Sequence, residues 1–109
     1  MKILCAFLLC SLALQDIDEL VARGLEKASA KDFEGAIAEY TKAIAVDPKN
    51  ATAYSYRGNA KASMKDFDGA MEDYSKAIEL VPGYTGAYNN RAHLKSLKGD
   101  QDGAIEDLT

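Results

Sequence analysis

The chain has 109 residues, with 13 lysines and arginines, 17 aspartates and glutamates, and a net charge of −4 at pH 7. The length suits one domain, and a hydrophobic fraction of 48% is enough to form a packed core. Acidic and basic residues are interspersed, so the chain lacks the basic stripe that binds nucleic acid or an anionic membrane surface.

The first fifteen residues differ from the rest of the chain. Lys2 is followed by an apolar run from Ile3 to Cys10 and then by the small residues Ser11 and Ala13. One positive charge, a short apolar run and small residues near a cleavage point are typical of a secretory signal peptide. Residues 1–15 are therefore predicted to be a signal peptide and the protein to be exported. The alternative is an N-terminal amphipathic or capping helix on a cytoplasmic protein.

The remainder, residues 16–109, repeats itself with a period of 34 residues. Residues 31–37 read KDFEGAI, residues 65–71 read KDFDGAM, and residues 100–105 read DQDGAI. Tyr40 and Tyr74 keep the same spacing, as do Pro48 and Pro82. A period in this range indicates stacked supersecondary units. The units are predicted at about residues 17–50, 51–84 and 85–109, the third being truncated.

Each unit is predicted to be a pair of antiparallel helices, here called A and B. Helix A of the first unit runs from about residue 17 to Ser29, and its helix B ends before Pro48, which disfavours the helical conformation of the preceding residue. In the second unit Asn50 is expected to cap helix A and Asp66 to cap helix B. The third unit begins near Thr85. The fold class is therefore all-α, a solenoid of stacked helix pairs.

Small residues recur where the two helices of a pair must approach each other. They are Gly24, Gly58 and Ala92 on the A helices, and Ala36, Ala70 and Ala104 on the B helices. One helix pair has too little core by itself, so each unit is expected to bury its second face against the next.

These positions resemble those of the tetratricopeptide repeat (TPR), and the resemblance extends from residue 17 to 109. It implies a right-handed superhelix whose concave groove is lined by the A helices, and a protein–protein interaction module without catalysis. Leu20 and Gln101 depart from the family pattern, because each replaces an aromatic residue. Some family members bind chaperone C-terminal carboxylates in this groove. Val21, Leu25 and Tyr56 stand in place of the lysine and asparagines that they use, so that function is not carried over.

Three arginines stand where the family usually has leucine, and each is followed sixteen residues later by an acid. The pairs are Arg23 and Glu39, Arg57 and Asp73, and Arg91 and Asp107. A partly buried arginine–carboxylate pair is predicted in every unit, because the guanidinium group can bind a carboxylate in a bidentate manner. The alternative is that the arginines only extend to solvent.

The sequence also predicts a binding surface along the A helices. Its residues are Ser55, Tyr56, Asn59, Asn89, Asn90 and His93. Residues three or four apart share a helix face, so we expect a nearly neutral, amide-rich strip that binds an extended, weakly charged peptide. The alternative is that these are ordinary solvated polar residues. Tyr56 is the expected hot spot.

No catalytic, metal-binding or cofactor-binding constellation is predicted. His93 is the only histidine, and the sequence offers neither an orienting partner nor a nucleophile with which it could act as a general base. Both cysteines, Cys5 and Cys10, lie in the predicted signal peptide, and Asn50 begins a glycosylation sequon. The protein is therefore interpreted as an interaction module or adaptor for a protein or peptide. A fragment of a longer repeat array and an accessory domain of a secreted enzyme are the alternatives.

The truncated third unit predicts one further property. Ile105 and Leu108 are expected on the face of the last helix that would receive another helix. We therefore expect a marginally stable protein that frays at this helix or self-associates through it.

Overall fold

The structure is a computed structural model that describes residues 17–97, 99 and 101–108. The predicted signal peptide and both cysteines lie outside these residues. The signal peptide and the export that it implies therefore stay predictions.

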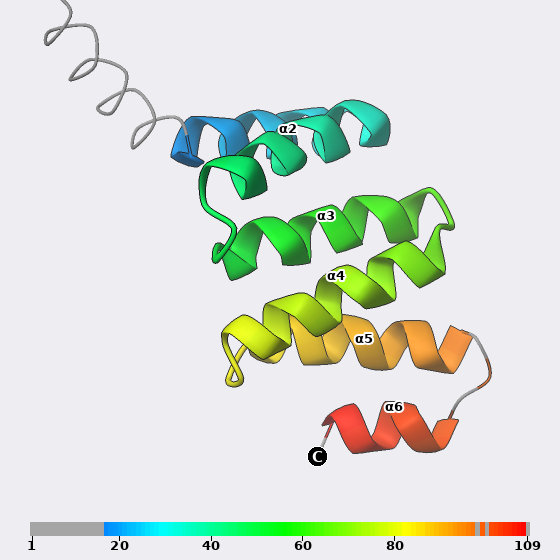
Figure 1. Cartoon of the computed structure of the whole chain (residues 1–109). Coiled ribbons are helices and arrows are strands. Elements are labelled where there is room, and N and C mark those ends of the chain that lie inside the picture. The colour runs from blue at the N-terminus through cyan, green and yellow to red at the C-terminus, as the bar shows by residue number, and fades with distance from the viewer. Residues whose placement is uncertain (1–16, 98, 100, 109) are drawn as a thin grey trace, which may run out of the picture.

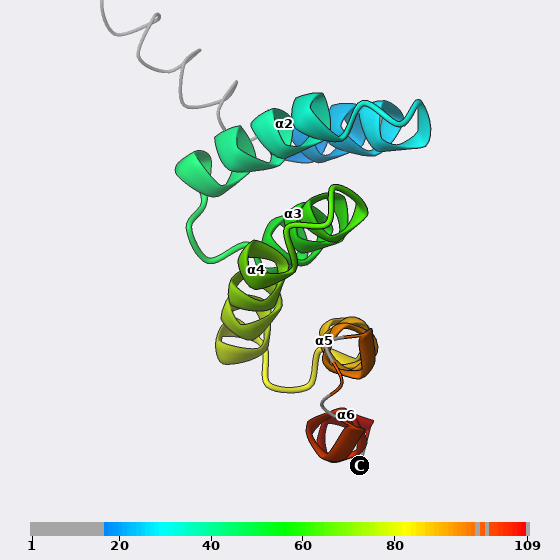
Figure 2. The same cartoon turned by 90° about the vertical axis from the view of Figure 1, so that its right-hand side faces the viewer.

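The described chain folds into successive helices joined by short turns. They are residues 17–29, α2 (Phe33–Val46), α3 (Ala51–Ser63), α4 (Phe67–Leu80), α5 (Thr85–Leu97) and α6 (Gln101–Leu108). Each helix packs on the next, and α3 also contacts α5, so the A helices of successive units adjoin. Figures 1 and 2 show the helix pairs stacked in chain order and turned relative to one another. The predicted α-solenoid fold is confirmed.

The helix boundaries follow from local chemistry. Asp32 and Asp66 cap α2 and α4, each accepting a hydrogen bond from a backbone N–H three residues on, at 3.0 and 3.1 Å. Asn50 caps α3 through its carboxamide oxygen, which accepts from the Ala53 N–H at 3.1 Å. These oxygens satisfy N–H groups that lack a partner within the first helical turn. The sequon residue Asn50 is therefore half-buried and held by its helix.

The turn inside each unit uses one left-handed residue. Lys31 has φ of 65°, Lys65 has φ of 66° and Gly99 has φ of 87°, at the same position in the three units. This conformation reverses the chain sharply, and a non-glycine residue adopts it at a free-energy cost.

The core lies both within each unit and between successive units. Ala36 and Tyr40 of α2 pack with Ala60 of α3, and the equivalent positions of the next unit, Ala70 and Tyr74, pack with Leu94. The buried ring of Tyr74 lies against Gly58, where an added Cβ would stand 2.7 Å from the ring atom Cε1. Glycine is therefore required here by the close approach of the two helices, as the sequence predicted.

The last helix leaves apolar surface uncovered. The Leu108 residue is 63% exposed, while the side chain of Ile105 lies outside those that the structure describes. Self-association through α6 stays a prediction. Within the described residues, the helices are too short or too polar to qualify as a membrane span.

Candidate functional site

The centre of the second unit is a buried ion-pair cluster. Arg57 donates to both carboxylate oxygens of Asp73, from Nε at 2.9 Å and from Nη2 at 2.8 Å. The side chain of Asp73 is only 5% exposed, and Lys61 Nζ lies 3.1 Å from its second oxygen. The hydrogen bond to Asp73 raises the pKa of Arg57, against the opposing effect of burial. The pair therefore has the predicted bidentate geometry.

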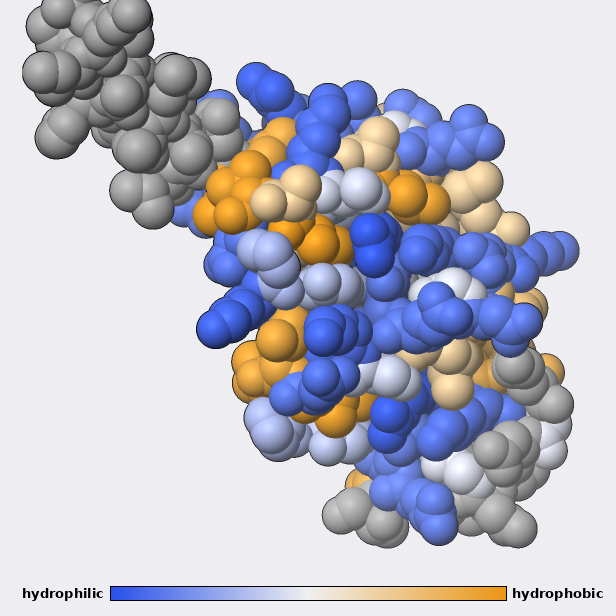
Figure 3. All heavy atoms as spheres, viewed as in Figure 1, coloured by the Kyte–Doolittle hydropathy of each residue, from blue (hydrophilic) through white to orange (hydrophobic). Residues whose placement is uncertain are grey.

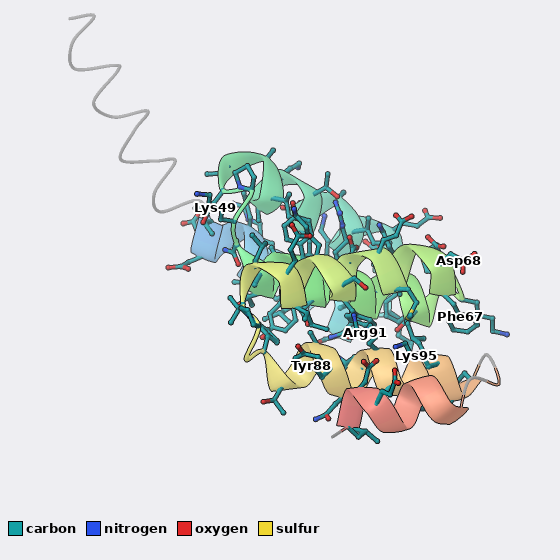
Figure 4. All side chains as sticks on the ribbon, turned by 60° about the horizontal axis from the view of Figure 1, so that its bottom comes forward. Lys49, Phe67, Asp68, Tyr88, Arg91 and Lys95 are labelled. Atoms are coloured by element: carbon teal, nitrogen blue, oxygen red, sulfur yellow. The ribbon has the colours of Figure 1, made fainter. Side chains whose placement is uncertain are left out.

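The third unit repeats this cluster. Arg91 donates to Asp107 from Nε at 2.9 Å and from Nη2 at 2.7 Å, and Lys95 Nζ lies 3.1 Å away. Figure 4 shows Tyr88, Arg91 and Lys95 along α5. The guanidinium of Arg91 lies over the Tyr88 ring, 5.5 Å from its centroid. The hydrogen bond from Arg91 is the main cause that lowers the pKa of Asp107.

The pair predicted in the first unit is wrong. Arg23 does not reach Glu39; its side chain is 62% exposed and lies 4.0 Å from Glu19. Lys27 and Lys42 instead approach one oxygen of Glu39, at 3.3 and 3.6 Å. The other oxygen is buried without a hydrogen-bond partner among the described residues. Glutamate is one methylene longer than aspartate, and here a lysine takes the contact that an arginine makes in later units.

Sequence reasoning missed two members of each cluster. Lys27, Lys61 and Lys95 follow their arginines by four residues in every unit, a signal that was available. The third guanidinium nitrogen, Nη1, donates to a hydroxyl on the preceding B helix, from Arg57 to Thr41 and from Arg91 to Ser75, at 3.3 Å in each case. The arginine therefore joins three helices, and the described part of the chain has no B helix before Arg23 to provide this contact.

Two adjoining hollows run across the A helices. The first has a volume of about 150 Å³ and the second of about 340 Å³. Asn59 and Ser63 line both, so the hollows form one groove. Leu25 and Tyr56 line the first hollow only, and His93 lines the second. Four predicted binding residues therefore line this groove, namely Tyr56, Asn59, Asn90 and His93.

Two predicted binding residues lie elsewhere. Ser55 is 2% exposed, because it shares a face of α3 with the buried Ala51 and is packed inside. Asn89 is exposed but lines a separate hollow of about 440 Å³ beside α6. It precedes Asn90 by one residue, and successive residues on a helix point about 100° apart, which separates the two. Placing Ser55 and Asn89 in the groove was wrong.

A chain of side-chain hydrogen bonds crosses the middle of the groove. The Tyr74 hydroxyl donates to Asn59 Oδ1 at 2.5 Å, and Asn90 Nδ2 donates to the same oxygen at 2.9 Å. Burial is the main cause that raises the pKa of Tyr74 to about 12. The three residues come from α4, α3 and α5, so the chain also ties neighbouring units together.

The groove is uncharged although the protein is acidic. Among the described residues that line its two hollows, there is no lysine, arginine, aspartate or glutamate. Figure 3 shows a different face, on which α2 and α4 lie in front; it is mostly hydrophilic, and its larger groups of hydrophobic atoms lie toward one edge. Val46 and Val81, each 43% exposed, lie just where α2 and α4 end. The described residues include no group of histidine, cysteine and acidic side chains arranged to hold a metal ion.

Comparison with protein-family models identifies the repeat. The TPR repeat model matches residues 24–65, and the tetratricopeptide repeat model matches residues 51–84. No curated protein matched the sequence.

Comparison with solved structures finds the same architecture. The TPR2B domain of yeast Sti1, in a complex with pHsp70, is 31% identical with a TM-score of 0.83, over 86% of this chain and 75% of that one. The first TPR of Spaghetti (RPAP3), bound to the HSP90 peptide SRMEEVD, is 28% identical with a TM-score of 0.82, over 85% and 74%. MamA is 28% identical with a TM-score of 0.81, over 84% of this chain and 54% of its own, so the chain spans about half of MamA.

Proposed function

Because the chain belongs to the tetratricopeptide repeat family, we propose that it is a protein-interaction module that binds an extended, weakly charged segment of a partner protein. The segment lies in the groove across residues 17–29, α3 and α5. Peptide binding by the Spaghetti domain supports a peptide as the ligand. The groove, however, offers a different chemistry from one that binds an acidic peptide.

The observation that carries this proposal is the absence of charge in the groove. None of the described residues lining its two hollows is a lysine, arginine, aspartate or glutamate. A peptide carboxylate would lose its hydration there without gaining a cationic partner, which is unfavourable. Apolar side chains from the peptide gain by contact with Leu25 at one end and Leu97 at the other. An uncharged segment with apolar side chains is the ligand that fits.

Two exposed leucines give a matched test. Leu97 is 59% exposed and lines the second hollow, whereas Leu108 is 63% exposed and lines the separate hollow beside α6. Truncation of either one removes little buried surface from the folded protein. Leu97→Ala should weaken binding about tenfold, since burial of a leucine side chain in a complex contributes roughly 1.5 kcal/mol. Leu108→Ala should leave binding unchanged.

The assay uses peptides selected from a random linear library displayed on phage, with the immobilised chain as bait. Synthetic forms of the selected peptides are then titrated against both variants by fluorescence anisotropy. Affinity should change little with salt, because the contacts are not between charges. Equal losses for the two leucine variants, or a preference for acidic peptides with strong salt dependence, contradict the proposal.

A further inference from the structure

One side chain of the groove belongs to a residue type that changes its charge near neutral pH. His93 lines the second hollow, and the described residues that line the two hollows include no lysine, arginine, aspartate or glutamate. An imidazole group gains a positive charge as pH falls from about 8 to about 5, a range in which most other side chains keep their charge state. Protonation of His93 therefore places a single charge in a groove that is otherwise uncharged.

The tyrosines of the groove do not titrate in this range. Tyr74 lines the second hollow beside His93, and burial, the largest cause, raises the pKa of Tyr74 to about 12. In the first hollow, burial is also the main cause that raises the pKa of Tyr40. A tyrosine ordinarily ionises near pH 10. The charge of the groove at neutral and mildly acid pH is therefore set by the imidazole.

The charged residues nearest to His93 on its own helix point away from the groove. Arg91 and Lys95 stand two positions before and after it, which turns each of them by about 200° around the helix. Both form ion pairs with Asp107 of α6. Glu106, another acid of α6, lines the separate hollow beside that helix. These groups therefore offer no counter-charge to a protonated His93.

The other helices that line the second hollow bring no charge to it either. α3 contributes Asn59, Ala62 and Ser63, and α4 contributes Tyr74. His93 is exposed, and its ring has no hydrogen-bond or ion-pair partner among the described residues. In the free protein, water is thus what stabilises the protonated ring.

A segment bound in the second hollow covers His93. Leu97 follows His93 by four residues, so the two share one face of α5, and both line this hollow. A segment that buries Leu97, which is 59% exposed, also removes water from the imidazole beside it. The neutral imidazole loses little by this, whereas the protonated one loses hydration without gaining a counter-charge.

We propose that His93 makes ligand binding by this groove dependent on pH, so that the groove holds its segment at neutral pH and releases it in mildly acid conditions. This inference rests on the proposed function, since it assumes an uncharged segment in the groove. The sign is fixed by the complex, which disfavours the cation. Affinity is therefore full above the range in which an imidazole titrates and is lost as pH falls through that range.

The size of the effect follows from the fraction of imidazole that is neutral. An ordinary imidazole is mostly neutral at about pH 7.5 and about nine-tenths protonated at about pH 5.5. When only the neutral form binds, the apparent affinity is reduced in proportion to the neutral fraction. The expected loss between the two conditions is about tenfold.

The second unit supplies a matched variant. Asn59 stands at the position equivalent to His93, so His93→Asn introduces a residue that the repeat already accepts there and that does not titrate. Because residue 93 is exposed, this change should leave the stability of the fold unaltered. Acid effects on the rest of the protein, such as those at Asp107, act equally on both chains, so the difference between them isolates His93.

The experiment measures affinity by fluorescence anisotropy at about pH 7.5 and about pH 5.5. The ligand is a peptide from the phage library that lacks titratable side chains and has acetylated and amidated ends. Its binding must be weakened by Leu97→Ala, which shows that it occupies the second hollow. The wild-type chain should lose about tenfold in affinity at the lower pH, and His93→Asn less than about twofold. Circular dichroism checks that both chains are folded at both pH values.

Proton NMR of the wild-type chain gives a second measurement that needs no variant. His93 is the only histidine, so its ring signals are assigned directly. Saturation with the peptide should move the midpoint of their titration to lower pH, because the coupling between proton and peptide is reciprocal. This midpoint decides the matter if His93→Asn binds too weakly to be titrated.

The outcomes separate this inference from the proposed function. If peptides bind and depend on Leu97, but wild type and His93→Asn respond equally to pH or the NMR midpoint does not fall, the inference fails and the proposed function stands. Wild-type affinity that rises at the lower pH also overturns the inference. Selected peptides that all ignore Leu97→Ala sink the proposed function itself.

Discussion

The contact between Gly58 and Tyr74 gives a prediction whose size can be worked out. A Cβ built on Gly58 would lie 2.7 Å from Cε1 and 2.9 Å from Cδ1 of a ring that is 2% exposed. Ordinary contacts begin near 3.4 Å, so ring or helix must move by about 0.7 Å in Gly58→Ala, and overpacking of this kind costs about 1–3 kcal/mol. Alanine regains up to roughly 1 kcal/mol through its helix propensity.

Because the Tyr74 ring is enclosed at 2% exposure, the overpacking cost should lie in the upper part of this range, about 2–3 kcal/mol, and the net effect of Gly58→Ala should be a loss of about 1–2 kcal/mol in the free energy of unfolding. For a domain of this size, that lowers Tm by roughly 5–15 °C. Thermal unfolding followed by circular dichroism measures the shift. Gly83→Ala is the control, because a Cβ there meets no atom within 4 Å, and its Tm should not fall.

A double variant tests the cause. Combining Gly58→Ala with Tyr74→Leu removes the ring that the new methyl group meets. The double variant should therefore lose less free energy of unfolding than the sum of the losses in the two single variants. Additive losses mean that the ring is not what Gly58 accommodates. A Gly58→Ala protein with wild-type or higher Tm refutes the overpacking argument outright, since helix propensity would then be the only effect.

Three further predictions concern stability. Asp73→Asn should lower the free energy of unfolding by about 2–3 kcal/mol, because it leaves the mostly buried cations of Arg57 and Lys61 without a counter-charge. The control is Glu79→Gln, which breaks an exposed ion pair and should cost less than about 0.5 kcal/mol; urea unfolding measures both. The pKa of Asp107 is lowered in the folded protein, so its contribution to stability is present above the ordinary aspartate pKa and is lost as pH falls toward the folded value. The protection factors of α6 amides, which are exchange rates corrected for the intrinsic effect of pH, should therefore fall over this range, and Asp107→Asn should lower them at neutral pH and remove this pH dependence; protection in α6 that does not change with pH in the wild-type chain contradicts this. Lys65→Gly should raise the free energy of unfolding by about 0.5 kcal/mol, because glycine adopts the left-handed turn without strain, as Gly99 does in the third unit; an unchanged or lower value in urea contradicts this.

The parts of the fold that repeat could be predicted from sequence. The fixed spacing of the repeat predicted the helix pairs, the caps at Asn50 and Asp66, and the arginine–aspartate pairs of the second and third units. These features depend on contacts between positions that recur in every unit. A pattern seen three times therefore carries its own evidence about which residues meet.

The predictions for Arg23 and Ser55 were wrong because the surroundings of these two residues are not what the repeat pattern implies. Arg23 lies in the first unit, and the described chain has no earlier B helix to hold its guanidinium, so it extends to solvent and pairs with Glu19. The spacing of four residues from Asn59 predicts that Ser55 faces the groove, but its small side chain is buried in the contact between helices. Helical periodicity alone does not say which side of a half-buried helix faces the groove when the residue is small enough to fit either side.

The contrast between repeated and unrepeated positions supports the proposed function. Tyr40 and Tyr74 are the same residue in two units, as are Gly24 and Gly58 in contact with them, so these positions maintain the stacking. The position that follows Gly24, Gly58 and Ala92 lines the groove, and it is leucine, asparagine and histidine in the three units, at residues 25, 59 and 93. Stacking needs the same contact in each unit, whereas an extended ligand presents a different group to each one. The variation at this position is what the proposed function requires of a groove that contacts successive residues of one peptide, and Asn59 is the member of the three that the structure holds in place with a buried hydroxyl.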